Sequence, residues 1–205
     1  MWIFALWIAV AFAASQQDRC WSDTTAKEAI SRLSTDQEAR SRFLATGMKK
    51  DEELRVLAID ADNATWLRAQ VRQCGWPQRS RVGEAVARSA WLLAQHADMA
   101  PDFQLEAAKA MKARVLEGEA SGHLLALLVD RHARLQKLPQ TYGMQFRLQE
   151  GKMVFLLIDD PENLDERRSA IGLLPFACHA EGSAKEQSVP FDWPAGVPRR
   201  NCASH

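Results

Sequence analysis

Apolar residues recur every three or four positions over most of the first 135 residues, which is the period of an amphipathic α-helix. Glycine and proline end helices, so Gly75-Trp76-Pro77 marks a break, and Asp62-Asn63 is typical of a turn or cap. The helices expected from this pattern span residues 24–43 (as one helix or two), 51–61, 64–73, 80–98, 101–117 and a segment beginning at 121 or 122.

The period changes after Pro139. Residues 145–148 and 153–158 are short β-type runs, and the polar residues between them predict a hairpin. Asp160-Pro161 favours the start of a short helix. The expected fold class is therefore mainly α, a bundle of about six to eight helices with a small β-hairpin near the C-terminal part.

One sizeable core is enough for 205 residues with 47% hydrophobic content, so we expect a single helical domain over residues 20–176. Residues 177–205 are small, polar and rich in proline, and we expect an irregular tail there. The 26 basic and 26 acidic residues cancel without forming a basic stripe, which argues against nucleic-acid binding.

The first fourteen residues, MWIFALWIAVAFAA, are apolar throughout and too short to span a bilayer comfortably. Ala11-Phe12-Ala13 fits a small-x-small cleavage signal, so residues 1–14 are interpreted as a secretory signal peptide. The expected location is secreted or periplasmic, with no stable membrane span after cleavage. Because the segment has no lysine or arginine, an uncleaved N-terminal anchor is the alternative.

Four widely spaced cysteines argue against a zinc site built from paired ligands. An even number in an oxidising compartment indicates two disulfides, for which three connectivities exist. The pairing favoured is Cys178–Cys202, which would fasten the tail, with Cys20–Cys74 near the new N-terminus. Free buried thiols are the alternative.

The helix expected over Ser80–Asp98 ends in Gln95-His96-Ala97-Asp98. His96 is the best candidate for a general acid or base, since the reference pKa of histidine lies near neutrality. Asp98 would face away from it on a helix, so Asp130, reaching across two helices, would be the better carboxylate to orient the ring. The alternative is a structural histidine that a backbone carbonyl satisfies.

Several motifs follow one another along the chain: Asp36-Gln37-x-x-Arg40, Gly75-Trp76-Pro77, Gln95-His96-Ala97-Asp98, Asp130-Arg131, Gln140-x-Tyr142-Gly143-x-Gln145 and Gly172-Leu-Leu-Pro175. This order resembles a bacterial family known only as a domain of unknown function, over roughly residues 25–176. Family members commonly have threonine where this chain has Met144. The resemblance implies a predominantly helical fold with a small β element, and it supplies no activity.

A hydrolase or transferase cleft is the first functional hypothesis. Arg131 would bind an anionic group and Tyr142 would donate a proton or hydrogen bond. The catalytic candidates are therefore His96, Asp130, Arg131 and Tyr142. The sequence contains no G-x-S-x-G, H-E-x-x-H or P-loop motif, and its histidines form no i,i+4 pair, so neither a metal nor a cofactor is expected.

A non-catalytic module that binds a peptide, a glycan or another small molecule is the second hypothesis. Glutamine side chains that converge would provide neutral donors and acceptors for a peptide backbone or a sugar. The ligand-binding candidates are Gln37, Arg40, Gln95, Asp98, Gln104, Gln140, Gln145, Arg167 and Arg168. For the two arginines, a structural salt bridge is the alternative to a substrate clamp. A purely structural or interaction protein is the third class.

Overall fold

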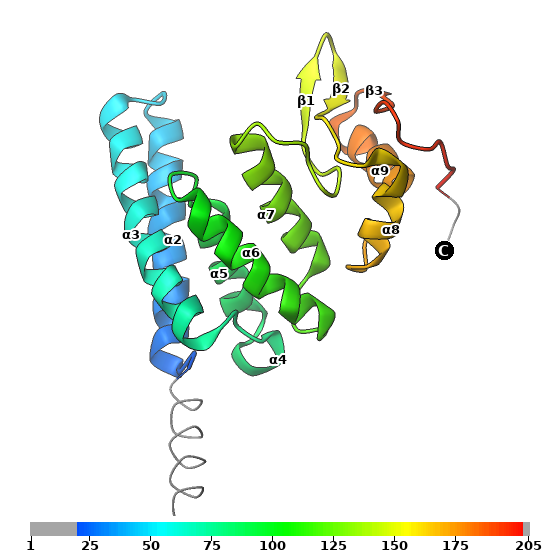
Figure 1. Cartoon of the computed structure of the whole chain (residues 1–205). Helices are drawn as coiled ribbons and strands as arrows, with labels where there is room; N and C mark the ends of the chain where they lie inside the picture. The colour runs from blue at the N-terminus through cyan, green and yellow to red at the C-terminus, as the bar shows by residue number, and fades with distance from the viewer. Residues whose placement is uncertain (1–19, 203–205) are drawn as a thin grey trace, which may run out of the picture. The chain divides into compact units, whose positions relative to one another are not determined.

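The computed structural model describes residues 20–202, and helices dominate it, as the sequence predicts (Figure 1). Two compact units are present, one ending at Phe103 and the other beginning at Gln104. The boundary falls within helix α6 (Pro101–Leu116). The predicted signal peptide lies outside the described residues. Among residues 20–202, no helix is long and apolar enough to cross a membrane.

The first unit contains helices α2 (Asp23–Ala45), α3 (Lys50–Cys74), α4 (Arg79–Val82) and α5 (Glu84–Gln95), with α2, α3 and α5 packed on one another. The prediction of two helices over 51–73 is wrong, because α3 continues through Asp62-Asn63. Asn63 is buried there and accepts a hydrogen bond from Arg32 of α2, whose guanidinium also pairs with Asp62 at 2.6 Å. These contacts between helices outweigh the local preference for a turn.

The helix expected over residues 80–98 is two helices that meet at Gly83, a residue with a φ of 82° that favours glycine. The second, α5, ends at Gln95, and His96 is its C-cap. Asp98 therefore lies in the following turn, where its backbone N–H donates to the His96 carbonyl at 2.8 Å. This early end decides the direction in which the His96 ring projects.

The second unit combines α7 with a small sheet and two further helices. Its elements are α7 (Gly122–Leu135), β1 (Phe146–Gln149), β2 (Lys152–Phe155), the 3₁₀ helix η1 (Pro161–Asn163), α8 (Leu164–Ser169), α9 (Phe176–Gln187) and β3 (Phe191–Asp192). The predicted hairpin is confirmed, and Glu150 and Gly151 both have positive φ at its turn, as a type I′ turn requires. Strand β3 pairs in parallel with β2.

The prediction of an irregular tail over residues 177–205 is wrong for residues 177–187, which belong to α9. Phe176, Ala177 and Ala180 place a narrow apolar stripe on this helix, and Phe176 stacks edge-on against Phe155 of β2. Both favoured disulfides are present. Cys178–Cys202 joins α9 to the end of the described chain, and Cys20–Cys74 joins the segment before α2 to the end of α3.

Candidate functional site

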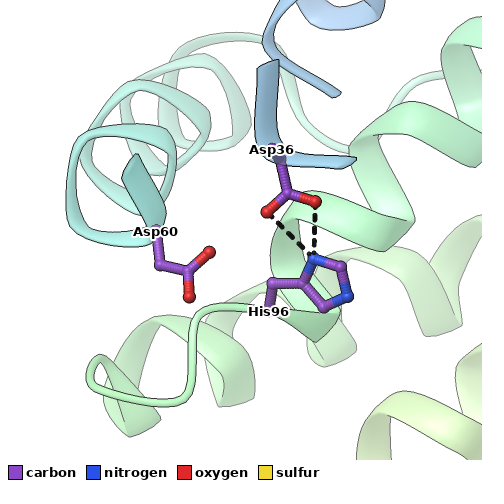
Figure 2. A group of neighbouring side chains, drawn as sticks. All are labelled: Asp36, Asp60 and His96. Carbon is purple, nitrogen blue, oxygen red and sulfur yellow. Dashed lines mark hydrogen bonds and ion pairs between the residues drawn. The ribbon is translucent and has the colours of Figure 1, made fainter. Parts of the chain in front are cut away.

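His96 and Asp36 meet in the first unit, where α2 packs on α5 (Figure 2). The Asp36 side chain is only 1% exposed, and its two carboxylate oxygens lie 3.0 and 3.1 Å from Nδ1 of His96. The histidine is 15% exposed because it caps the end of α5 instead of lying within the helix. A buried carboxylate thus holds one ring nitrogen of a partly accessible histidine.

Arg40 lies one turn after Asp36 on α2 and connects this pair to α3. Its Nε donates to Asp36 Oδ1 at 3.1 Å, and its Nη2 donates to Asp60 Oδ1 at 2.5 Å. The Asp60 side chain is 8% exposed. One guanidinium therefore serves two buried carboxylates.

The hydrogen bonds decide which ring nitrogen of His96 carries the proton. Nδ1 lies 3.0 Å from Asp36 and 3.1 Å from Nε of Arg40, and in a neutral ring it can donate or accept but not both. A tautomer that accepts from Arg40 would place its lone pair against the Asp36 carboxylate. We therefore assign the Nδ1 proton to the bond with Asp36, which leaves the lone pair on Nε2. No described residue is seen to hydrogen-bond to Nε2.

Two carboxylates share one guanidinium, so one negative charge is left without a cation when His96 is neutral. Burial raises the pKa of Asp36, but the hydrogen bond and charge of His96, together with Gln37 and Arg40, lower it by more, and the net shift is downward. Burial raises the pKa of Asp60 to about 6, with the Asp36 charge adding to it and Arg40 opposing it. Asp60 is thus the carboxylate that takes up a proton first.

Asp36, Asp60 and His96 offer one ligand atom each within 4.8 Å of one another, a spacing compatible with a metal ion. The Arg40 guanidinium already bridges the two carboxylates, however, and its Nε lies beside Nδ1 of His96. A divalent cation would have to displace it. The cation that this donor set fits is Arg40 itself, and we assign no metal here.

A pocket of about 200 Å³ opens beside Asp60 within the same unit. Its lining comes from one face of α3, from the turn after α5 and from the start of α6. The lining residues are Asp60, Ala61, Ala64, Thr65, Arg68, Ala97, Met99, Ala100 and Phe103. Asp60, which lies close to His96 and Asp36, is therefore the member of this group that lines a small, mostly apolar space.

Asp130 belongs to the second unit and serves its backbone. Its carboxylate accepts hydrogen bonds from the N–H groups of Thr141 at 2.7 Å, Tyr142 at 3.1 Å and Met144 at 2.8 Å. Burial raises the pKa of Asp130, and these N–H groups oppose that rise. The carboxylate that holds His96 is therefore Asp36, and our assignment of that role to Asp130 is corrected.

The other two catalytic candidates lie near Asp130. Tyr142 is 5% exposed, and burial, followed by the Asp130 charge, raises the pKa of its hydroxyl. Arg131 is half-buried on α7. Neither belongs to the group of side chains around His96, which lies wholly in the first unit. The structure thus supports only His96 among the four catalytic candidates as a member of that group.

Gln140 is buried and fully engaged with the backbone. Its Nε2 donates to the carbonyls of Gln145 at 3.0 Å and Leu156 at 2.9 Å, and its Oε1 accepts from the Gln145 N–H at 2.7 Å. An amide bonded in this way closes the loop before β1 and has little left to offer a ligand. Gln145 contributes its backbone carbonyl and N–H groups to these hydrogen bonds.

Arg167 and Arg168 hold carbonyl groups of the same loop. Arg168 is 2% exposed, and it donates to Leu174 O at 2.8 Å and Tyr142 O at 2.5 Å. Burial lowers its pKa to about 10. Arg167 donates to Thr141 O at 3.1 Å and pairs with Asp160 at 3.2 Å. These contacts favour the structural interpretation of both arginines over a substrate clamp.

The remaining candidates are divided between the two units. Gln37 donates to Asp36 Oδ2 at 2.7 Å and so supports the site from its rim. Gln95 is buried on α5, Asp98 lies in the turn that follows, and Gln104 is fully buried in the second unit. The convergence of the five glutamines on one ligand stays a prediction.

The sequence analysis missed two site residues: Asp36, which it named only as part of a motif, and Asp60. Asp60 lies four residues after Val56 and four before Ala64, on the buried stripe of α3. An acidic residue in an apolar stripe is costly to bury without a partner. The position of Asp60 in that stripe could therefore have identified it from the sequence as a residue with a buried partner. Asp36 could have been identified by its i,i+4 spacing to Arg40, which places the two side chains on the same face of a helix.

The comparisons with known proteins give one match. The family described as "Family of unknown function (DUF6624)" matches residues 24–181, a range that includes Asp36, Arg40, Asp60 and His96. No curated protein and no solved structure matches the chain.

Proposed function

We propose that this chain, which belongs to the family of unknown function DUF6624, is a hydrolase or transferase in which His96 is the general base and Asp36 orients it. The observation that carries the proposal is the 3.0 Å contact between Nδ1 and the Asp36 carboxylate, with Nε2 left to accept a proton. Asp36 fixes the tautomer and stabilises the imidazolium that forms when Nε2 is protonated.

The nucleophile in this proposal comes from the substrate or from water. All four cysteines are in disulfides, so neither Cys74 nor Cys178 can attack. Among residues 20–202, no serine or threonine hydroxyl is seen to hydrogen-bond to His96. His96 would take a proton from a water or hydroxyl oxygen as that oxygen attacks the electrophilic atom. The same proton would then pass to the leaving group.

The two disulfides support the view that the enzyme acts outside the cytoplasm, since such bonds form and persist in oxidising compartments. The apolar N-terminal segment with its cleavage signal supports the same location. The substrate would accordingly be a periplasmic or extracellular molecule.

The test is a survey of turnover with the purified, oxidised protein. Chromogenic carboxylic esters, amides, glycosides and phosphoesters represent the four main bonds that a water-activating base can cleave. We expect the wild-type protein to turn over at least one of these classes. His96→Ala and Asp36→Asn should each lower kcat/KM by at least about 100-fold, the lower end of general-base contributions.

His123→Ala is the matched control, because this exposed histidine belongs to the other unit and its replacement should leave kcat/KM unchanged. Circular dichroism establishes that each variant is folded. Full activity in a folded His96→Ala protein would contradict the proposal, and so would the absence of wild-type turnover across all four classes.

A further inference from the structure

We infer that the pocket beside Asp60 binds a primary alkylammonium group, the amine end of the substrate on which His96 acts. This inference rests on the proposed function, because it assigns the pocket to the substrate of the same site. It adds a substrate class, a short apolar chain that ends in an amine.

The pocket walls fit the apolar part of such a group. Four alanines, Met99 and Phe103 provide most of the lining, so a ligand there loses water from methylene groups without losing hydrogen bonds. A volume of about 200 Å³ is of the same order as the cavity of about 150 Å³ that holds a benzene molecule in another protein. A chain of four or five carbons with one polar end is of this size.

The charge of the site fits the amine. Asp60 Oδ1 is bound by Arg40, and the Asp60 side chain forms part of the pocket lining. Asp36 and Asp60 share one guanidinium, so the buried group has a negative charge in excess, and buried charges require a partner. An ammonium group supplies the balancing positive charge and three N–H donors.

The positions of the two charged residues in the lining lead us to expect the polar end of the ligand at Asp60. Arg68, the other charged residue of the lining, follows Asp60 by eight positions on α3, or about 12 Å along the helix axis. One oxygen of Asp60 and one ring nitrogen of His96 lie within 4.8 Å of each other. An amine held at Asp60 would therefore lie close to the His96 ring, and the rest of the substrate would extend past the ring to Nε2, which points away from Asp60 (Figure 2).

Binding should depend on pH through Asp60. Because burial raises its pKa to about 6, a proton competes with the ammonium below that pH. Affinity for the amine therefore increases as pH rises through about 6, and it levels off once Asp60 is ionised. The charged groups that face Asp60 are Arg40 and Asp36, with His96 beyond them.

The experiment uses n-butylamine, 1-butanol and butyrate as probes, with the methyl NMR signals of Met99 and of the pocket alanines as the readout. Butylamine should bind at least about tenfold more tightly than butyrate at pH 7.5 (a factor worth about 1.4 kcal/mol). Asp60→Asn should remove that advantage and leave butanol binding unchanged. Ala64→Leu, which fills the pocket from α3, should abolish binding of both.

Butyrate binding as tightly as butylamine would overturn the inference, as would an Asp60→Asn protein that retains the preference for the amine. If Asp60→Asn does not fold, the pH dependence of butylamine binding to the wild-type protein provides the same test, and a flat profile between pH 5 and pH 8 would overturn it. Turnover without amine binding would thus defeat this inference alone, and amine binding without turnover would defeat the proposed function alone.

Discussion

Replacing Asp130 by alanine is expected to lower the free energy of unfolding by about 4 kcal/mol. The carboxylate is fully buried and accepts hydrogen bonds from the backbone N–H groups of Thr141, Tyr142 and Met144. Removing it leaves these donors without an acceptor, and each buried donor left in this way costs about 1–3 kcal/mol. Urea denaturation with the disulfides intact measures the change.

Two variants make this prediction specific. Asp130→Asn keeps one carbonyl oxygen in place, so it should lose less than half as much stability as the alanine variant. Asp192→Ala removes an exposed acid that pairs with Lys152 at 3.3 Å, and it should stay within about 0.5 kcal/mol of wild type. An Asp130→Ala protein within 1 kcal/mol of wild type would show that water satisfies the loop and that our account of Asp130 is wrong.

Removing the disulfide between Cys20 and Cys74 is expected to cost about 4 kcal/mol. The two cysteines are 54 residues apart, and constraining a loop of that length reduces the entropy of the unfolded chain by a corresponding amount. Trp21 Nε1 donates to Gly75 O at 3.1 Å beside this disulfide, so we expect the double serine variant to keep the folded arrangement while its stability falls. Urea denaturation again provides the measurement.

The Cys178–Cys202 pair offers the comparison, since it spans 24 residues and its removal should cost about 3 kcal/mol. Adding a reductant to the wild-type protein should reproduce the combined loss. A Cys20→Ser, Cys74→Ser protein as stable as wild type would mean that the first disulfide adds nothing to stability and that our account of it is wrong.

Local pattern predicted most of the fold because helix and hairpin signals are short-range. The alternation around Glu150-Gly151 is enough to specify β1 and β2, and the spacing of the cysteines with the compartment favoured both disulfides. The continuous α3 could not be predicted in this way. Its middle is held by Arg32 from another helix, thirty residues away, and that contact has no local signature.

The candidate site could be predicted only in part, because its members come from distant parts of the chain. His96 stands out by its chemistry alone, but its partner is sixty residues earlier in the chain and comes together with it only when α2 packs on α5. Asp130 stands out equally in the sequence, at the end of an apolar run. Its carboxylate instead accepts the N–H groups of a loop eleven residues on, a role that only the folded backbone reveals.

The central claim is that Asp36 holds the Nδ1 proton of His96 and so leaves Nε2 as a base. The most direct test is the ¹⁵N NMR spectrum of the His96 ring, recorded at a pH where the ring is neutral. We predict a protonated Nδ1 and an unprotonated Nε2, and we expect Asp36→Asn to reverse the tautomer because the new amide can donate to Nδ1. A wild-type ring protonated at Nε2, with Nδ1 accepting from Arg40, would contradict the account.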